Sequence, residues 1–361
     1  MNKKILMKGN EALAEAAIRA GLKGYFGYPI TPQSEILEYL SRHLVGSNRV
    51  FLQAESEVAA INMVYGAAGC GERVMTSTSS PGFSLMQEGI SYIACAELPC
   101  LLVNVVRGGP GLGTIQPSQG DYFQAVKGGG HGDYKLLVYA PNSVQEMADF
   151  VYKGFDAADK YRTPVLILTD GALGQMMEPV VFPDYNPDNH YTNHSAWATR
   201  GKSKNRDPNV ITTLNLEADA MEKTNIHLQA KYKSIMENEV MFETIETEDA
   251  DFLLIAFGLT SRIAHKALEM ARENNIKVGL LRPQTLFPFP TQAIAELAEN
   301  VQAILTIEMN AGQMVEDVRL AVNGRTPVYF YGRMGGVIPQ PNEIYQKIKD
   351  VYHSSSKQIS E

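Results

Sequence analysis

Short runs of β-forming residues alternate with helical patterns along most of the chain, and this alternation restricts the possible fold strongly. In the first half the expected strands are 24–28, 50–53, 73–76, 100–106, 136–139 and 165–168. The expected helices between them are 10–20, 35–44, 58–68, 84–94 and 143–161. Because strands that alternate with helices usually pair in parallel, we predict an α/β fold whose parallel sheet has helices on both faces.

A change in composition separates this half from the rest of the chain. Residues 183–247 are rich in Asn, Pro and His and hold one polar helical segment at 218–239, so we interpret them as a linker or surface excursion. Alternation then resumes, with strands expected at 252–257, 277–281, 301–307 and 328–331 and helices at 261–274, 291–298 and 314–322. We therefore expect an α/β domain at 1–182, the linker at 183–247 and a smaller α/β domain at 248–361.

The composition argues against several classes of protein. The 32 Lys and Arg residues are outnumbered by 40 Asp and Glu, which gives a net charge of −8 and no basic stripe for nucleic acid. Cys70, Cys95 and Cys100 are too few for the four thiolates of an iron–sulfur cluster, and they form no Cys-x-x-Cys pair. Neither a signal peptide nor a run of about 18 apolar residues is present, so we expect a cytoplasmic protein.

The segment Tyr28-Pro29-Ile30-Thr31-Pro32 connects an expected strand to an expected helix. We expect Thr31 to be the N-cap of that helix and Pro32 its first residue. A helix N-terminus at the carboxyl end of a parallel strand also attracts anions, and a threonine hydroxyl can donate a hydrogen bond to a carboxylate. Thr31 is therefore either an ordinary cap or a cap that also binds an anion.

Glu57 leads the apolar stripe of the next expected helix, and Glu55 lies just ahead of that stripe. The other members of the stripe are Ala60, Ile61, Val64 and Ala68. One interpretation is that Glu57 is a first-turn acid that complements the helix dipole. The other is a partly desolvated carboxyl that shares a proton with the nitrogen of a buried ligand. We expect Glu55 to be exposed or to lie behind the site.

A glycine-rich loop, 107–113, follows the expected strand at 100–106 and begins with Arg107. It is a poor match to a dinucleotide-binding loop, because Pro110 interrupts the glycines and no apolar helix opens directly after it. Arg107 is either a surface arginine or a side chain that binds a carboxylate through two parallel hydrogen bonds. The sequence also lacks a P-loop, a His-Glu-x-x-His motif, a nucleophile elbow and the Gly-Asp-Gly motif that holds a magnesium diphosphate.

At several of these segments the chain closely resembles the alpha subunits of 2-oxoacid:ferredoxin oxidoreductases, and the similarity covers nearly the whole sequence. The segments that carry the resemblance are 28–32, 53–66, 107–110, 120–121, 131–133 and 332–336. The segment 28–32 is highly specific in this setting, and the glycine-rich segments are much less so. Within the family, the resemblance is nearest to the branch that acts on 3-methyl-2-oxobutanoate, and the 2-oxoglutarate branch is close behind.

The resemblance implies a fold and a set of site residues. It implies a thiamin-enzyme pyrimidine-binding domain first and a transketolase C-terminal-like domain second. By matching motifs, Thr31 contacts the 2-oxoacid, Arg107 binds its carboxylate, and Glu57 contacts the aminopyrimidine of thiamin diphosphate, with Glu55 as the alternative. Tyr28 and Pro29 are the further residues implied for cofactor binding, and no metal-ligating residue is implied.

The resemblance also implies an activity that this chain performs only with partners. The reaction is oxidative decarboxylation of a 2-oxoacid to acyl-coenzyme A and CO2 with reduction of ferredoxin. The missing diphosphate motif implies a beta subunit that shares thiamin diphosphate and holds magnesium, and the cysteine count places the iron–sulfur clusters in other chains. Gamma and ferredoxin-like subunits complete the expected hetero-oligomer. A 2-oxoglutarate enzyme and a noncatalytic scaffold paralogue are the alternatives.

Overall fold

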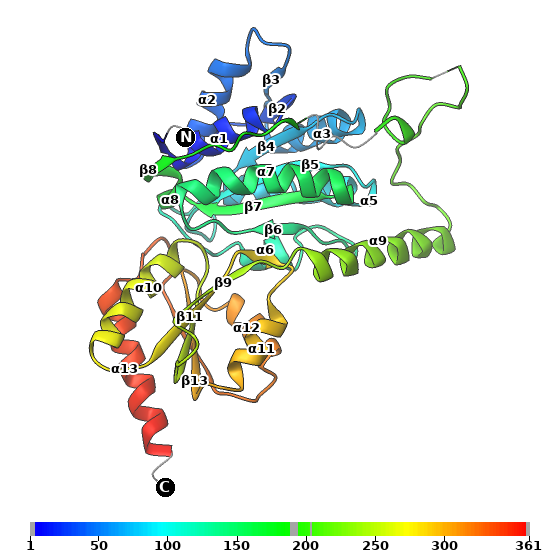
Figure 1. The fold of residues 1–361 in the computed structure, drawn as a ribbon. Helices are drawn as coiled ribbons and strands as arrows, with labels where there is room; N and C mark the ends of the chain where they lie inside the picture. Colours follow the sequence, from blue (N-terminus) through cyan, green and yellow to red (C-terminus); the bar gives the residue numbers. More distant parts are fainter. Residues whose placement is uncertain (1–3, 188–193, 203, 359–361) are drawn as a thin grey trace.

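The structure is a computed structural model that describes residues 4–187, 194–202 and 204–358 (Figure 1). It contains a seven-stranded sheet, a five-stranded sheet and a small two-stranded sheet that pairs β1 (Ile5–Lys8) with β8 (Met177–Val180). Among the described residues, no helix combines the length and the apolar character needed to cross a bilayer. The predicted α/β fold class is confirmed.

The seven-stranded sheet is parallel except at one edge. From edge to edge its strands are β12 (Thr285–Phe287), β6 (Leu137–Tyr139), β7 (Pro164–Asp170), β5 (Cys100–Val106), β4 (Val74–Thr78), β2 (Gly24–Gly27) and β3 (Val50–Gln53). Only β12 runs antiparallel to its neighbour. The six strands predicted in the first half of the chain are all present, and their carboxyl ends lie at one edge of the sheet.

Helices cover both faces of this sheet, as predicted. One face carries α1 (Gly9–Arg19), α2 (Ser34–Leu44) and α7 (Val144–Tyr161), and the other carries α3 (Glu57–Gly69), α4 (Ser80–Leu85) and α5 (Gln87–Cys95). The single helix expected at 84–94 is wrong, because α4 begins at Ser80 and ends next to Met86, where α5 follows. Pro81 lies in the first turn of α4, where a missing N–H costs nothing.

The five-stranded sheet contains the strands expected after residue 251. Its order is β14 (Val328–Gly332), β13 (Ala303–Glu308), β10 (Phe252–Ile255), β11 (Val278–Pro283) and β9 (Phe242–Ile245), with only β9 antiparallel. One face packs on α10 (Gly258–Glu273) and α13 (Pro341–Gln358). The other face shares an apolar core with the first sheet, together with α11 (Thr291–Ala298) and α12 (Met314–Val322).

The segment between the two sheets contains the helix expected near 218–239, which is α9 (Ala218–Asn238). Figure 1 shows α9 beside the lower part of the seven-stranded sheet. Leu228, Tyr232 and Ile235 on one face of α9 are buried in the first apolar core. The exposed apolar side chains of Ile226 and Met236 lie outside this buried face, which explains the weak amphipathic pattern of the helix.

Gln119 links the two sheets through hydrogen bonds. It is buried, and its Nε2 donates to the Phe257 carbonyl at 2.8 Å. Its Oε1 accepts from the Thr260 hydroxyl at 2.7 Å and from the Met309 N–H at 2.9 Å. Its own N–H donates to the Met309 carbonyl at 3.0 Å. Because Phe257 and Met309 lie just beyond β10 and β13, one residue of the first sheet's loops holds the carboxyl ends of two strands in the second.

We predict that Gln119→Ala lowers the free energy of unfolding by about 2–4 kcal/mol, because it leaves the Met309 N–H and the Phe257 carbonyl buried without a partner. Urea unfolding of the full chain measures this change. The matched control is Gln346→Ala on the exposed face of α13, which should change the free energy by less than about 0.5 kcal/mol. Equal effects of the two substitutions would contradict the role of Gln119.

Candidate functional site

The strand order reverses between β2 and β4 at the carboxyl edge of the seven-stranded sheet. From β2 the chain passes outward to β3, and α3 then carries it back across β2 to β4. The connections therefore leave β2 and β4 toward opposite sides of the sheet. In doubly wound sheets, ligands bind outside the carboxyl ends of the strands at such a reversal. The segments that follow β2, β3, β4 and β5 are thus the ones that can build a site.

Thr31 lies in the loop after β2 and is exposed, but it does not cap α2 as predicted. Gln33 occupies the N-cap position, and Pro32 lies outside the helix. The side chain of Gln33 is fully buried: its Nε2 donates to the Tyr28 carbonyl at 3.1 Å, and its Oε1 accepts from the Ser77 hydroxyl at 2.7 Å. Because the Gln33 side chain is held inside the protein by these bonds, α2 begins only at Ser34, and the Thr31 hydroxyl lies outside the helix.

Arg107 follows β5 and is buried, with 7% of its surface exposed, so the interpretation as a surface arginine is wrong. Its Nη1 donates to the Thr31 carbonyl at 3.0 Å, and its Nη2 donates to the Leu112 carbonyl at 2.9 Å. Its Nε–H is buried and has no partner among the described residues. Two of the sequence-predicted residues, Thr31 and Arg107, are therefore in direct contact, and the guanidinium keeps donors for a further group.

Glu57 is the first residue of α3, and 5% of its surface is exposed. Ser56 is the N-cap, with its side chain accepting from the Ala59 N–H at 3.2 Å. The residues predicted to share a stripe with Glu57 are all buried, namely Ala60, Ile61, Val64 and Ala68. Among the described residues the Glu57 carboxylate makes no hydrogen bond or ion pair, whereas Glu55 is exposed, as expected.

The short helix α4 contacts both Glu57 and Arg107. A Cβ atom on Gly82 would lie 2.3 Å from Glu57 Oε1 and 2.1 Å from Thr78 Oγ1, so the carboxyl group packs against a backbone where only glycine fits. Two residues earlier, Ser80 Oγ accepts from the Arg107 N–H at 3.1 Å. Thr31, Arg107 and Glu57 are therefore linked through α4, although they are far apart in the sequence.

Unpaired polar atoms lie at the same edge of the sheet. Buried side-chain atoms without a hydrogen-bond partner in the described chain include Thr78 Oγ1, Ser79 Oγ, Asn104 Oδ1, Arg107 Nε and Thr169 Oγ1. All of these residues lie at or near the carboxyl ends of β4, β5 and β7. Buried polar groups are normally hydrogen-bonded, so a concentration of unpaired ones is typical of a surface that binds a polar ligand.

Two aspartates at the same edge were not predicted as site residues. Asp121 Oδ2 accepts from Ser80 Oγ at 2.6 Å and from Asn104 Nδ2 at 2.9 Å, and burial raises the pKa of its carboxyl group. Asp170 at the end of β7 accepts from the N–H groups of Ala172 and Leu173, and burial raises its pKa to about 6. Asp170 is the last residue of the buried strand β7, and Asp121 lies in the connection between the buried strands β5 and β6. These positions near the carboxyl ends of strands are the signal that could have identified both residues.

A loop from the second sheet packs beside Arg107. A Cβ atom on Gly108 would lie 2.8 Å from the Gly335 carbonyl carbon and 2.9 Å from the Gly336 nitrogen. A Cβ on Gly336, whose φ is +99°, would lie 2.5 Å from Gln116 Cβ. The glycines at 335–336 therefore permit close approach of two backbones, and the loop that begins with Arg107 is supported from the second sheet.

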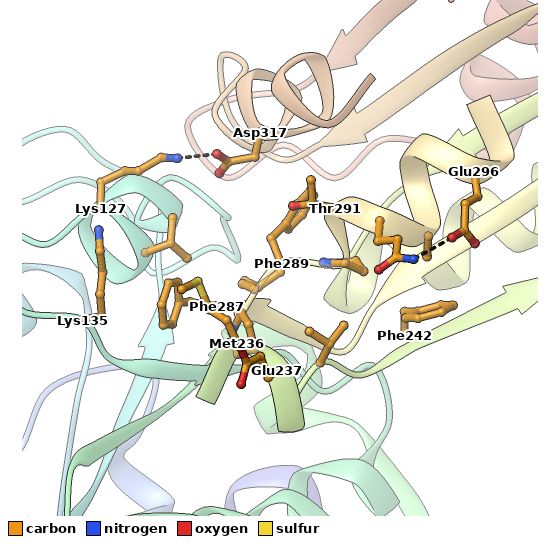
Figure 2. Close-up of a pocket in the computed structure, with 17 residues that line it drawn as sticks. Lys127, Lys135, Met236, Glu237, Phe242, Phe287, Phe289, Thr291, Glu296 and Asp317 are labelled. Carbon is orange, nitrogen blue, oxygen red and sulfur yellow. Dashed lines mark hydrogen bonds and ion pairs between the residues drawn. The ribbon is translucent and has the colours of Figure 1, made fainter. Parts of the chain in front are cut away.

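A cavity of about 800 Å³ lies elsewhere (Figure 2). It lies between α9, α11 and β12, and its walls include Phe242, Phe287 and Phe289. Figure 2 shows Lys127 and Asp317 joined by an ion pair at its rim. The cavity includes none of the predicted site residues. In the described part of the chain, no group of three His, Cys, Asp or Glu residues is arranged to hold a metal ion.

The chain matches two protein families in succession. Residues 15–247 match the family described as Pyruvate flavodoxin/ferredoxin oxidoreductase, thiamine diP-bdg. Residues 250–344 match Pyruvate:ferredoxin oxidoreductase core domain II. The first match contains all of the segments that build the carboxyl edge described above.

The chain is also similar to named relatives over nearly its whole length. It is 50% identical to the Ketoisovalerate oxidoreductase subunit VorB of Methanothermobacter marburgensis, over 97% of this chain and 99% of the relative. It is 36% identical to the 2-oxoglutarate synthase subunit KorA of the same organism, over 96% of this chain and 99% of the relative.

Two solved structures are similar in fold. One is a 2-oxoglutarate:ferredoxin oxidoreductase from Magnetococcus marinus with 2-oxoglutarate, coenzyme A and succinyl-CoA bound, with a TM-score of 0.84 and 28% identity. The match covers 97% of this chain and 65% of that chain. A split-gene transketolase shares the fold with a TM-score of 0.56 and 15% identity, covering 97% of this chain and 95% of that chain. From the family match and the 50% identity over nearly its full length, this chain belongs to the 2-oxoacid:ferredoxin oxidoreductase family.

Proposed function

We propose that this chain is the alpha subunit that completes a thiamin diphosphate site in a 2-oxoacid:ferredoxin oxidoreductase acting on 3-methyl-2-oxobutanoate. Glu57 is the residue proposed to contact the aminopyrimidine, and Thr31 and Arg107 are those proposed for the substrate carboxylate. The observation that carries the proposal is the buried Glu57 carboxylate, which makes no hydrogen bond within the described chain and lies against Gly82 beside unpaired polar atoms.

The residues at the carboxyl edge fit the aminopyrimidine half of the cofactor. A carboxyl group held in an apolar helical stripe exchanges a proton with a ring nitrogen more readily than an exposed one, because water does not compete for it. Tyr28 is half-buried and Pro29 is exposed beside this edge, consistent with a role in contacting the ring. Thiamin diphosphate, when bound, supplies a carbon nucleophile for the keto carbon and accepts the electrons released as CO2 leaves.

We propose that Arg107 orients the substrate. Its Nε–H is buried without a partner in the described chain, so a ligand oxygen that reaches it would complete its hydrogen bonding, and its two Nη groups are held in place by the carbonyls of Thr31 and Leu112. A guanidinium fixed in this way binds a carboxylate with little further loss of side-chain freedom. The exposed Thr31 hydroxyl lies on the loop that Arg107 contacts and can donate a second hydrogen bond.

The choice of acid rests on the relatives and on the residues around Arg107. The relative at 50% identity is named for ketoisovalerate, and the one at 36% is named for 2-oxoglutarate. The loop opened by Arg107 carries the exposed apolar side chains of Leu112 and Ile115. Neighbours of this kind are compatible with a branched aliphatic tail, which needs no second cation.

We propose that the remaining parts of the active site come from partner subunits. A beta subunit would hold the diphosphate and magnesium, and other chains would hold the iron–sulfur clusters, with coenzyme A and ferredoxin as the co-substrates. Cys70, Cys95 and Cys100 are all free in the described chain, and Cys100 is buried in β5, where burial raises the pKa of its thiol. Leu85 on α4 and Val58 on α3 are exposed apolar side chains beside the proposed cofactor position, and contact with a partner would cover them.

The substitution Glu57→Gln tests the proposal directly. In the reconstituted complex we expect it to keep the fold and to abolish hydrogen–deuterium exchange at C2 of bound thiamin diphosphate, because an amide cannot take up and release the ring proton. NMR of quenched samples measures this exchange. Glu55→Gln is the matched control, because Glu55 is exposed two residues away, and it should exchange at the wild-type rate. Normal exchange in Glu57→Gln would contradict the proposed role.

A second prediction concerns the substrate carboxylate. Arg107→Ala should lower kcat/KM for every 2-oxoacid, and the loss should correspond to about 2 to 5 kcal/mol of transition-state stabilisation. The ranking of the substrates should stay unchanged, because all 2-oxoacids share that carboxylate. Thr31→Val should cost less, because it removes one neutral donor. Because the N-cap of α2 is Gln33 and not Thr31, Thr31→Val should not lower the stability through α2.

Steady-state kinetics with 3-methyl-2-oxobutanoate, 2-oxoglutarate and pyruvate provide the measurement. Thermal unfolding of each variant separates a loss of binding from a loss of structure. If Arg107→Ala damages only the reaction of 2-oxoglutarate, Arg107 reads the second carboxylate of that acid. The substrate would then be 2-oxoglutarate and the branched-chain proposal would be wrong.

A further inference from the structure

Asp121 occupies the N-cap position of α6 (Tyr122–Val126), but its side chain makes no capping hydrogen bond to that helix. Its carboxylate is turned instead toward the end of β5. There its Oδ2 accepts from Ser80 Oγ at 2.6 Å and from Asn104 Nδ2 at 2.9 Å. Since an aspartate at this position commonly caps the helix, the different orientation needs another cause.

The Ser80 hydroxyl connects Asp121 to Arg107. Ser80 Oγ accepts from the Arg107 N–H at 3.1 Å, and it lies 3.2 Å from the Arg107 carbonyl oxygen and 2.6 Å from Asp121 Oδ2. A hydroxyl has only one proton to donate, and the nearer carboxylate oxygen is the stronger acceptor. The hydrogen bonds therefore run in one direction, from the Arg107 N–H to Ser80 and from Ser80 to Asp121.

Asn104 holds the other end of this chain of hydrogen bonds. It is fully buried in β5, three residues before Arg107, and its neighbours in that strand are apolar. Its amide donates to Asp121 Oδ2. The Asp121 carboxylate is thus held by two donors, Ser80 and Asn104. These hydrogen bonds also fix its distance from the start of the Arg107 loop. An amide buried within a strand is costly unless it makes such a bond.

We propose that Asp121 is a positioning residue for the substrate, acting through Ser80 on the backbone from which the Arg107 guanidinium extends. The proposal rests on the proposed function of Arg107 as the residue that binds the 2-oxoacid carboxylate. Asp121 orients the Ser80 hydroxyl so that its lone pairs face the Arg107 N–H. Without Asp121 the hydroxyl proton can turn to the Arg107 carbonyl, and the direction of the Ser80 lone pairs toward the Arg107 N–H is no longer fixed.

Kinetics of the reconstituted complex with 3-methyl-2-oxobutanoate test the proposal. We expect Asp121→Ala and Ser80→Ala each to raise the KM of the acid by about tenfold, with a smaller effect on kcat. The double variant should resemble either single one, because the two residues act in series. Asp121→Asn, which keeps an oxygen acceptor for Ser80, should raise KM less and remains informative if Asp121→Ala does not fold. The control is Asp207→Ala, since the Asp207 side chain is 98% exposed.

The decisive comparison repeats Asp121→Ala or Asp121→Asn in the Arg107→Ala background. There the further change in KM should be less than about twofold, because the guanidinium that Asp121 helps to position is absent. A general structural role would lower thermal stability in both backgrounds, but it would not make the KM effect depend on Arg107. An undiminished KM effect without Arg107, or no KM effect with it, would overturn the inference. If Arg107→Ala alone leaves every KM and kcat/KM unchanged, the proposed function fails first.

Discussion

Parallel pairing of six strands is the constraint on which the candidate site depends, because it places the carboxyl ends of β2, β3, β4 and β5 at one edge. The short helix α4 then occupies the centre of that edge. Its Ser80 binds the backbone of Arg107, and the missing side chain of Gly82 admits the Glu57 carboxyl group. The Arg107 guanidinium in turn binds the loop that carries Thr31. Residues from four separate connections become neighbours in this way.

This arrangement has a cost for the isolated chain. Each buried polar atom without a partner destabilises a fold by about 1–3 kcal/mol, and several such atoms lie around α4. The Arg107 Nε–H is one of them, and the Glu57 carboxylate makes no hydrogen bond to any residue that the structure describes. Polar groups that the fold already holds in position, and that have no partner in the protein, bind a polar ligand with little reorganisation. Contacts such as those of Gln119 stabilise the two sheets and offset part of this cost.

The sequence predicted the parts that depend on periodicity and missed those that depend on tertiary contacts. Glu57 was placed correctly in a buried stripe, because a helix repeats every 3.6 residues whatever packs against it. Thr31 was wrongly expected to cap α2, because Gln33 occupies that position and is buried by a contact with Ser77 in β4, a strand distant in the sequence. The edge strands β9 and β12 were not predicted, because each is short and pairs antiparallel with a strand distant in the sequence. The link from Asp121 to Ser80 joins residues 41 positions apart, which no local pattern reveals.

We propose that the carboxyl edge around α4 receives both the aminopyrimidine ring and the carboxylate of the substrate. A structure of the assembled complex with thiamin diphosphate and a 2-oxoacid bound tests this placement. We expect a Glu57 carboxyl oxygen within about 3 Å of a pyrimidine ring nitrogen and the Arg107 Nε within about 3 Å of a substrate carboxylate oxygen. A ring bound in the cavity beside Phe287 and Phe289, or a Glu57 carboxyl group that contacts only protein, would contradict it.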